Sequence, residues 1–314
     1  MRLITEAEVA AVLDPDSAVA ALRAAFAQHG RGRAQVLGRH RATSTQDGAA
    51  LAISAMGAIL DADAAADGGL PAVLGTKVYS ARNGRYHFLV SLFSAATGAP
   101  IATLEANEFT RLRTAAATAV AADLLARPDA RTLAVFGAGI QARAHAEALY
   151  RVRRFERVLV CARSGADALA RELQAALGLT VRSAAVAEAA AEADVIVTAT
   201  RSATPLFDGG LVKAGAFVAA VGTSTPTARE LDDALLGRAS LVAVEWLGAA
   251  RHEAGELVLA APGVVPAERL VELGALLVEP RPRGPLDIVV YKSVGIGLED
   301  VALARLVARR LGLC

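Results

Sequence analysis

A glycine turn in the middle of the chain constrains its fold more than any other feature. The segment Gly137-Ala138-Gly139 follows the apolar run 133–136 and precedes a helical pattern that begins Ile140-Gln141-Ala142. This is the spacing G-x-G-x-x-G/A between an expected strand and an expected helix. The first glycine permits a tight turn, the second lets backbone approach a pyrophosphate, and Ala142 lets helix and strand pack closely. We therefore predict a Rossmann turn with a dinucleotide at the helix N-terminus.

Strand and helix patterns alternate after this turn. Apolar runs occur at 158–161, 194–198 and 216–221, and a helical pattern occupies 166–176. Apolar strands separated by helices are typical of a parallel sheet that is buried on both faces. We expect an α/β protein in which residues 115–293 form a Rossmann dinucleotide-binding domain.

The first third of the chain has a different pattern. Residues 51–56, 74–79 and 86–93 are expected strands, and Asn83-Gly84 is a typical two-residue hairpin turn. Helix caps are expected at Thr5, with Glu8 completing a capping box, and at Asp16-Ser17. An Ala-rich helix is expected over 110–125, and a final helix after Glu299-Asp300. We predict an α+β domain over 1–114, to which residues 294–314 return.

Composition narrows the class of protein. Hydrophobic residues make up 54% of the 314 residues, which excludes a disordered chain. The net charge of +1 gives no electrostatic reason to expect binding to nucleic acid or to an anionic membrane. Cys161 and Cys314 have no spacing for a disulfide framework or a metal site, and no histidine has convincing zinc-ligand spacing. Apolar stretches end before they reach a bilayer span, and no signal-like segment opens the chain. We expect a cytoplasmic globular protein without a metal.

The end of the strand 158–161 bears on the choice of cofactor. NAD enzymes place an acid there for the ribose hydroxyl, but this chain has Cys161 and Ala162, followed by Arg163 and Ser164. An arginine beside a hydroxyl suits the 2′-phosphate of NADP. We predict that NADP(H) is preferred, with NAD(H) as the alternative cofactor. The alternative for Arg163 is an ordinary solvated surface arginine with no role in cofactor binding.

Three cations of the N-terminal half stand in apolar surroundings. They are Lys77 inside a strand, Arg113 on the Ala-rich helix, and Arg41, or its neighbour Arg39, ahead of residues 51–56. A buried cation needs a partner because an unpaired charge is costly to bury. A substrate carboxylate is one such partner. The protein carboxylates Glu105 and Glu108 are the structural alternative, and both readings stay open at this point.

Several motifs together resemble those of the ornithine cyclodeaminase/mu-crystallin family over nearly the whole chain. They are Gly75-Thr76-Lys77, Leu112-Arg113-Thr114-Ala115-Ala116, the turn 137–142, the run 193–200, Arg229-Glu230-Leu231-Asp232, Gly255-Glu256-Leu257 and Lys292-Ser293-Val294-Gly295. The resemblance implies a homodimer whose N-terminal domains pair through their sheets. It also implies a small amino- or imino-acid substrate that lies between the domains, beside the nicotinamide.

The resemblance also assigns roles to individual residues. Lys77, Arg113 and Arg41 match residues that bind the substrate carboxylate, and Val294 matches a residue beside the substrate. With the residues derived above, the expected cofactor contacts are Thr114, Gly137, Ala138, Gly139, Ile140, Gln141, Arg163, Ser164, Thr200, Val221, Gly222 and Ser293.

Two departures from the family pattern point to the type of reaction. Ornithine cyclodeaminases have an aspartate where this chain has Ser224, and a glutamate where it has Ser54. Both acids would handle substrate amino groups. The reductase members instead have a serine at the loop position, and an Arg-Thr type pair where this chain has Arg163-Ser164. Ser224 is accordingly expected beside the substrate.

We expect an NAD(P)H-dependent oxidoreductase that reduces a small imino acid, a ketimine of the pyrroline-2-carboxylate type, or oxidises the matching amino acid. Lys77 is the expected catalytic residue, because burial beside arginines lowers the pKa of an amine that donates a proton. One alternative is ornithine cyclodeaminase, an NAD-dependent lyase that converts ornithine to proline and ammonia. Another is a non-catalytic NADPH or small-molecule binding protein of the mu-crystallin type.

Overall fold

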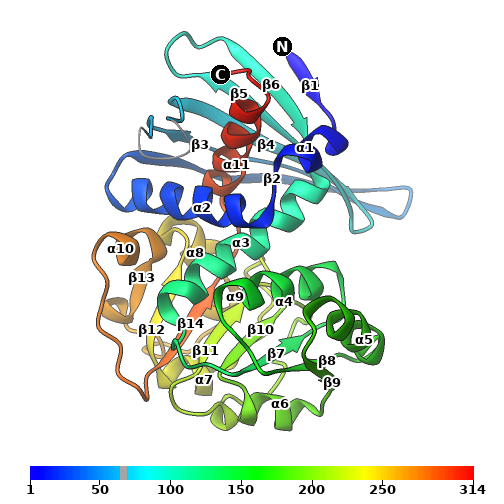
Figure 1. Ribbon diagram of the computed structural model, residues 1–314, viewed down its shortest axis with the longest axis vertical. Helices are drawn as coiled ribbons and strands as arrows, with labels where there is room; N and C mark the ends of the chain where they lie inside the picture. Colours follow the sequence, from blue (N-terminus) through cyan, green and yellow to red (C-terminus); the bar gives the residue numbers. More distant parts are fainter. Residues whose placement is uncertain (64–68) are drawn as a thin grey trace. The chain divides into compact units, whose positions relative to one another are not determined.

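The computed structural model describes residues 1–63 and 69–314, which form two compact units (Figure 1). The N-terminal unit consists of residues 1–117 together with 295–314, and the Rossmann unit consists of residues 118–294. Each unit has its own sheet. The expected fold class, an α/β protein with a Rossmann domain and an α+β domain, is confirmed.

The N-terminal unit is built on a six-stranded sheet in the order β1-β6-β5-β4-β3-β2, antiparallel except for the β1–β6 pair. Its strands are β1 (Arg2–Ile4), β2 (Ala34–Gln46), β3 (Ala49–Leu60), β4 (Val73–Arg82), β5 (Arg85–Ser94) and β6 (Pro100–Glu105). Its helices are α1 (Glu6–Val12), α2 (Pro15–Gly30), the first part of α3 (Asn107–Leu125) and α11 (Gly297–Arg310).

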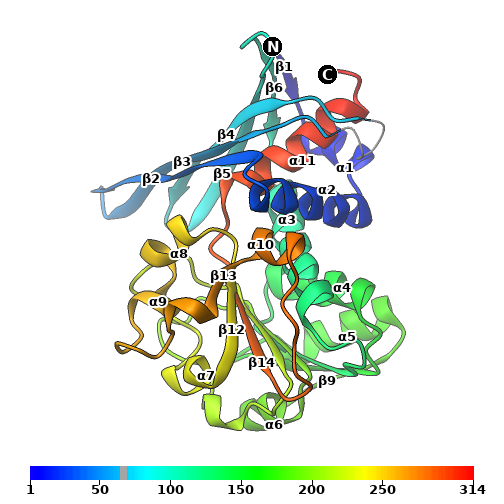
Figure 2. The ribbon, with the colours of Figure 1, turned by 90° about the vertical axis from the view of Figure 1, so that its left-hand side faces the viewer.

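Helix α11 packs across one face of this sheet, with α2 beside it (Figure 2). We call this the inner face. Along β4 the residues Val73, Gly75, Lys77 and Tyr79 are buried, while those between them are more exposed, as the two-residue period of a strand requires. The start of α11 lies directly on β3, since a Cβ on Gly297 would come within 2.4 Å of the Gly57 nitrogen. This close approach sets the first turn of α11 against the inner face.

The Rossmann unit is an eight-stranded parallel sheet in the order β13-β12-β14-β11-β10-β7-β8-β9. Its strands are β7 (Thr132–Phe136), β8 (Arg157–Cys161), β9 (Thr180–Ser183), β10 (Val195–Thr198), β11 (Phe217–Ala220), β12 (Ala239–Val244), β13 (Leu270–Glu272) and β14 (Ile288–Lys292). Its helices are α4 (Ile140–Val152), α5 (Ala166–Leu177), α6 (Val186–Glu192), α7 (Asp233–Arg238), α8 (Leu247–Glu253), α9 (Gly255–Val258) and α10 (Leu273–Val278), with short 3₁₀ turns at Gly209–Leu211 and Ala267–Arg269.

The order of strands creates a switch point between β7 and β10. From β7 the chain proceeds outward through β8 and β9, and then returns to β10 on the other side of β7. Residues of β7 are buried on both faces, with Ala134 and Phe136 in the core beneath α6 and α7. In sheets of this kind, ligands bind at the carboxyl ends of the strands that flank the switch point. We therefore expect a ligand site at the loops after β7, β10 and β11.

Local sequence patterns account for most elements of the N-terminal unit. The expected strands correspond to β3, β4 and β5, and Asn83 and Gly84 both have positive φ angles, of 50° and 75°, as the hairpin turn requires. Thr5 and Glu8 form the expected capping box. The cap predicted at Asp16-Ser17 is wrong, because Asp14 caps α2 through the Ser17 nitrogen and Pro15 occupies the first helical position.

In the described parts of the chain, no helix is both long and apolar enough to cross a bilayer.

Candidate active site

Lys77 lies on the inner face of β4 and its side chain has no exposed surface. Its Nζ donates to Asp300 Oδ1 and to Thr110 Oγ1, at 2.8 Å in each case. The ammonium also lies 4.5 Å from the centroid of the Phe88 ring, within range of a cation–π interaction. The expected buried lysine therefore exists, and the first turn of α11 supplies its anionic partner.

Arg113 joins the same cluster from α3. Its Nη1 donates to Glu299 Oε2 at 2.7 Å, and its Nε lies 3.5 Å from Asp300 Oδ1. Gly295 packs against the guanidinium, because a Cβ there would come within 2.5 Å of Arg113 Nη1. Gly295 also has a φ of +72°, which favours glycine. A glycine at this position is what allows the arginine to lie against the backbone.

The carboxylates proposed as structural partners are the wrong ones. Glu105 accepts from the backbone nitrogen of Glu6, and Glu108 pairs with Arg111. Glu299 and Asp300 take their place, although they are 186 and 223 residues away in sequence from the cations they bind. The sequence showed them only as acids at the start of the last helix, where acids are common for reasons of helix capping.

Burial alters the acidity of Lys77. Loss of solvation lowers the pKa of the ammonium to about 8, and the Arg113 charge acts in the same direction, while Asp300 opposes both. An amine with such a pKa exchanges protons near neutral pH, which is the property required of a general acid or base.

Arg39 and Arg41 both lie on the inner face. The pairing of β2 with β3 has a register shift between Leu37 and His40. This shift sets which strand partners the following residues of β2 have. Arg39 Nη2 donates to the Gly295 carbonyl at 2.7 Å, and Arg41 pairs in register with Ser54. Sequence reasoning treated the two arginines as competitors for one role, whereas the structure brings both to the same face.

Ser54 and Tyr79 form a polar patch beside these arginines. Arg41 Nε donates to Ser54 Oγ and Arg41 Nη2 donates to the Tyr79 hydroxyl, each at 3.0 Å. Ser54 is 1% exposed and Tyr79 is 7% exposed. Burial raises the pKa of Tyr79, but Arg39, Ser54 and Arg41 outweigh it, so the net pKa lies below its ordinary value. Tyr79 carried no sequence signal that set it apart from a packing residue.

In the Rossmann unit, the glycine turn connects β7 to α4 as expected. Gly137 has a φ of +120°, and a Cβ there would come within 2.6 Å of the Ala199 carbonyl oxygen. Gly139 is the N-cap of α4, with an ordinary φ of −89° and no side-chain cap. A Cβ on Gly139 would meet nothing within 4 Å. The two glycines thus serve different purposes, one internal to the fold and one facing open space.

The residues of the turn fit a dinucleotide. The first backbone N–H groups of α4 have no side-chain cap, and these are the groups that bind phosphate oxygens in such folds. Ile140, at the first position of the helix, is 74% exposed, which is high for a large apolar residue and leaves its surface available for a ligand. Ala142 is fully buried and permits close helix packing.

Arg163 and Ser164 follow β8 and both side chains are exposed. The next residue, Gly165, lies beside the glycine turn, because its Cβ would be 3.5 Å from that of Ala138. The loop that carries the arginine therefore borders the turn.

Glu230 connects the ends of β10 and β11. Its carboxylate accepts from the Thr198 hydroxyl, from the Thr200 nitrogen and hydroxyl, and from the Gly222 nitrogen, at 2.6–2.8 Å. It is fully buried, and burial raises its pKa although Lys292 and the hydrogen bonds act in the opposite direction. Val221 lies next to Gly222 and is half-buried. A single carboxylate therefore positions two of the expected cofactor residues.

Another buried acid, Glu256, extends this arrangement. Its carboxylate accepts from the Glu230 nitrogen and pairs with Lys292 at 2.8 Å. The Lys292 ammonium also donates to the Thr223 carbonyl at 2.7 Å. The neighbouring Ser224 is half-buried.

Glu245 accepts from the Ser293 hydroxyl and the Val294 nitrogen. Glu230 and Glu256 lie in motifs that carried the family resemblance, but sequence reasoning gave neither of them a role, and it did not single out Glu245.

The remaining expected cofactor residues are placed as follows. Thr114 belongs to the N-terminal unit, where its hydroxyl donates to the Thr110 carbonyl at 2.8 Å. Gln141 follows Ile140 in the first turn of α4 and is half-buried. Across residues 1–63 and 69–314, no group of three His, Cys, Asp or Glu side chains has the geometry of a metal site.

Several known proteins resemble the chain in sequence and structure. A probable ornithine cyclodeaminase from Bordetella pertussis superposes with a TM-score of 0.91 at 43% identity, covering 99% of this chain and 97% of that one. The iminosuccinate reductase of Paracoccus denitrificans is 32% identical over an alignment of 317 positions, which covers 98% of this chain and 95% of that protein. Its crystal structure with NAD⁺ superposes with a TM-score of 0.89 at 30% identity, covering 99% and 96% of the two chains.

A third relative was solved with both ligands of a reductase. The Δ1-pyrroline-2-carboxylate reductase of Thermococcus litoralis, in complex with NADH and L-proline, superposes with a TM-score of 0.87 at 26% identity, covering 99% of this chain and 97% of that one. The family model for ornithine cyclodeaminase/mu-crystallin matches residues 1–312. The chain belongs to the ornithine cyclodeaminase/mu-crystallin family.

Proposed function

We propose that the protein is a nicotinamide-dependent oxidoreductase that reduces the C=N bond of a small imino acid or oxidises the matching amino acid. The observation that carries the proposal is the cluster of Lys77 and Arg113 on the inner face, in a chain that also has a Rossmann turn fitted to a dinucleotide. The relatives that act on cyclic or linear imino acids support the same reaction.

The loops that surround the switch point would hold the dinucleotide. The N-terminus of α4 would bind the pyrophosphate, and Thr200, Val221 and Gly222 at the ends of β10 and β11 would contact the cofactor. Ser293 follows β14, where Glu245 fixes its hydroxyl. When bound in its reduced form, the cofactor supplies the hydride that reduces the imine carbon.

Substrate binding follows from the charges of the inner face. Arg113 and Lys77 bind the carboxylate, with Arg41 and Arg39 from β2 on the same face. Arg113 contributes a planar pair of N–H donors and Lys77 a point charge. Because both side chains are held by Glu299 and Asp300, they are oriented before substrate arrives and little entropy is lost on binding.

Lys77 is the group that exchanges a proton with the imine nitrogen. Its pKa of about 8 leaves it protonated at neutral pH yet able to release the proton. In reduction, Lys77 Nζ donates a proton to the imine nitrogen as the imine carbon becomes tetrahedral. Solvent then returns a proton to the Lys77 amine. In oxidation the neutral amine of Lys77 accepts it. Asp300 stabilises the charged form throughout.

Two serines favour this reaction over deaminating cyclisation. Ser54 and Ser224 stand where a cyclodeaminase would carry acids for the amino groups of a basic substrate. In this chain Ser54 instead accepts a hydrogen bond from Arg41, so the environment is cationic and repels a side-chain ammonium. Ornithine cyclodeaminase remains the alternative function, and a non-catalytic binder is disfavoured by the intact Lys77–Asp300 and dinucleotide sites.

The experiment that tests the function is a cofactor-oxidation assay with Δ1-pyrroline-2-carboxylate and with 2-oxo acids plus ammonium. Steady turnover of at least one imine, abolished by Lys77→Met, is expected. Release of ammonia and proline from ornithine with NAD⁺ would instead establish the cyclodeaminase. Tight cofactor binding with no turnover of any of these substrates would indicate a binding protein.

We propose that NADP(H) is preferred over NAD(H). Arg163 and Ser164 supply a guanidinium and a hydroxyl at the position where NAD enzymes carry an acid. Titration of the protein with NADPH and NADH is expected to give a lower Kd for NADPH, by about 10-fold or more for one charge-assisted contact. Arg163→Ala should remove most of that preference. Equal affinities in the unaltered protein would contradict it.

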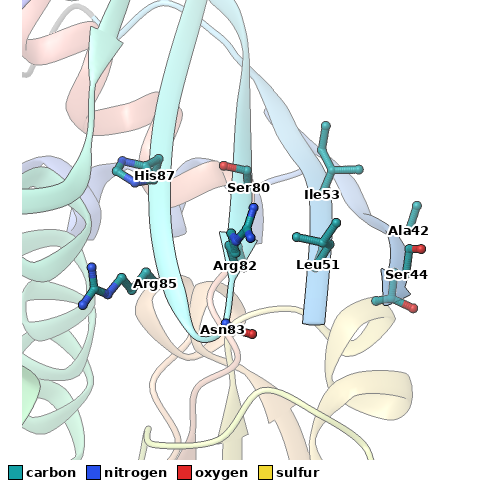
Figure 3. A pocket seen from close by; sticks show the side chains of 12 residues that line it. Ala42, Ser44, Leu51, Ile53, Ser80, Arg82, Asn83, Arg85 and His87 are labelled. Carbon is teal, nitrogen blue, oxygen red and sulfur yellow. The ribbon is translucent and has the colours of Figure 1, made fainter. Parts of the chain in front are cut away.

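We also propose that the protein is a homodimer paired through the outer face of the N-terminal sheet. This face exposes large apolar side chains from four strands, namely Leu37, Ile53, Ile59, Val78 and Leu89, each at least 40% exposed. A groove of about 930 Å³ lies on the same face. Leu51, Ile53 and Ser80 are among the residues that line it, and Figure 3 shows their side chains. An apolar face of this extent is characteristic of an interface.

Light scattering tests the dimer. Ile53→Glu together with Val78→Glu is expected to give monomers, because each places a charge in the interface. Val186→Glu, on a valine of the Rossmann unit that is 44% exposed, is the control and should leave the mass unchanged. The cytoplasmic location remains a prediction from the sequence.

A further inference from the structure

One oxygen of the Asp300 carboxylate has no hydrogen-bond donor. Oδ1 accepts from Lys77 Nζ at 2.8 Å and lies 3.5 Å from Arg113 Nε. Oδ2 is also buried, and no group in the described parts of the chain donates a hydrogen bond to it. The Asp300 side chain as a whole has no exposed surface. A buried carboxylate oxygen without a donor is costly, so this oxygen indicates a donor that the chain itself does not supply.

The neighbouring acid, Glu299, shows the contrast. Its Oε2 accepts from Arg113 Nη1 at 2.7 Å, and its Oε1 accepts from the Ile296 nitrogen at 2.9 Å, so both oxygens have donors. Glu299 and Asp300 are adjacent in the first turn of α11 and both are fully buried. Of the two acids, Asp300 is therefore the one with an acceptor available for a ligand.

The available oxygen belongs to the same small group that contacts both proposed carboxylate-binding residues. Lys77 and Arg113 approach Oδ1 from β4 and from α3. In an imino acid, the nitrogen is attached to the carbon that carries the carboxylate. A ligand whose carboxylate lies on Lys77 and Arg113 therefore keeps its nitrogen within reach of Asp300. This nitrogen is a donor of the kind that Oδ2 lacks.

We propose that Asp300 Oδ2 accepts a hydrogen bond from the nitrogen of the bound imino acid and thereby selects a C=N substrate over the 2-oxo acid of the same shape. The inference rests on the proposed reductase function and deepens it, because it adds a contact with the reacting nitrogen to the ion pair with Lys77. The oxygen of a 2-oxo acid has lone pairs only, and these are repelled by a carboxylate oxygen. A site built to bind an N–H group rejects the analogue that lacks it.

Lys77 and Asp300 then have separate roles at the nitrogen. When hydride adds to the imine carbon, the electron pair of the C=N π bond moves to nitrogen and binds the proton that Lys77 releases. Asp300 accepts a hydrogen bond and takes no proton, so its negative charge is kept. An imine formed from ammonium already carries an N–H for Oδ2. A cyclic imine gains its N–H from Lys77 during the step.

A pair of planar ligands tests the contact without turnover. Pyrrole-2-carboxylate and furan-2-carboxylate have the same ring shape, the same carboxylate and the same charge, but the ring atom at the position of the imine nitrogen is an N–H in the first and an oxygen in the second. Calorimetric titration of the cofactor-loaded protein is expected to give a Kd about 30-fold lower for pyrrole-2-carboxylate, the value of one hydrogen bond to a charged group.

Two adjacent variants locate the preference. Asp300→Asn replaces the free acceptor by an amide donor and should abolish or reverse the preference. Glu299→Gln is the matched control, because it neutralises the neighbouring acid that holds Arg113. It should weaken both ligands alike and leave the ratio of the two Kd values unchanged. Thermal melts establish that the variants are folded. Lys77→Met/Asp300→Asn leaves no uncompensated charge at the pair and should also lack the preference, so it serves if Asp300→Asn alone does not fold.

Turnover provides a second measurement. The 2-oxo acid that gives the fastest reaction with ammonium is assayed with and without ammonium, and the ratio of the two rates is compared between variants. The fraction of imine in solution is the same for every variant, so a change in the ratio comes from the protein. Asp300→Asn should lower this ratio by about 30-fold, and Glu299→Gln should leave it unchanged.

The outcomes separate the inference from the proposed function. Equal Kd values of the two ligands in the wild-type protein, or a preference that persists in Asp300→Asn, show that a buried water satisfies Oδ2 and overturn the inference, while the reductase function stands. Equal loss of the preference in Glu299→Gln also overturns it. If no imine is reduced but the preference depends on Asp300, the contact stands and the function is wrong. If neither ligand binds the cofactor-loaded protein, both are wrong.

Discussion

The ammonium of Lys77 and the carboxylate of Asp300 form an ion pair of 2.8 Å in which neither side chain is exposed. The pair joins the middle of β4 to the first turn of the last helix. Burying two charges costs more free energy than a well-packed apolar pair would, so such a pair is weak evidence for stability and is better explained by a functional need for charge. In this protein the need is a cation that binds and protonates the substrate.

The first prediction separates stability from function at this pair. Asp300→Asn leaves a buried lysine without its anion and should lower the free energy of unfolding by about 3 kcal/mol. Lys77→Met/Asp300→Asn removes both charges and should recover most of that loss without recovering activity. Urea unfolding followed by circular dichroism measures the stabilities. Equal stability of the single and double variants would show that the pair does not couple.

The second prediction concerns pH. With its pKa of about 8, Lys77 is protonated below that pH and attracts a carboxylate, and it is neutral above it. Using preformed Δ1-pyrroline-2-carboxylate, kcat/KM should therefore fall as pH rises through about 8. Lys77→Arg keeps the charge at all these pH values, so this limb should be absent from its profile, whatever activity remains. A wild-type profile that is flat from pH 7 to pH 10 would rule out this role for Lys77.

The third prediction uses the two glycines of the dinucleotide turn as a matched pair. Gly139→Ala adds a methyl group that meets no protein atom, so the unfolding midpoint should hardly change while the Kd for the cofactor rises by about 10-fold or more. Gly137→Ala forces a clash with the Ala199 carbonyl at a φ of +120° and should destabilise the protein itself. Calorimetric titration and thermal melts distinguish the two effects. Unchanged cofactor affinity in Gly139→Ala would place the pyrophosphate elsewhere.

The fourth prediction concerns Glu230, which positions Thr200 and Gly222 without being assigned a contact with the cofactor. Glu230→Gln replaces one acceptor oxygen by an amide that faces a donor, so at least one of these hydrogen bonds is lost. We expect the KM for the cofactor to rise by about 10-fold.

The substrate KM at saturating cofactor should stay close to that of the wild type. Glu245→Gln, which disturbs a buried acid beside Ser293 instead, is the comparison. A similar increase in both KM values in Glu230→Gln would indicate general loosening of the unit.

The Rossmann unit was predictable because its signals are local. The turn at Gly137 needs glycine for the conformation of its own backbone, and the apolar runs report burial of strands on both faces.

Strand β2 of the N-terminal unit was missed, although it is 13 residues long, because its second half is polar and exposed and lacks the alternation of a half-buried strand.

The sequence by itself therefore determined the fold class, the dinucleotide turn and the identity of the cations that need an anion. Only the tertiary structure decided which anions they have, since Glu299 and Asp300 reach Arg113 and Lys77 through the packing of α11 on the sheet. It also decided that Arg39 and Arg41 lie on the inner face, because the pairing of β2 with β3 sets which side of the sheet these residues face. The physical reason is the same in both cases. Local patterns report the needs of a segment, whereas the partner that meets a buried charge depends on which distant segments pack together.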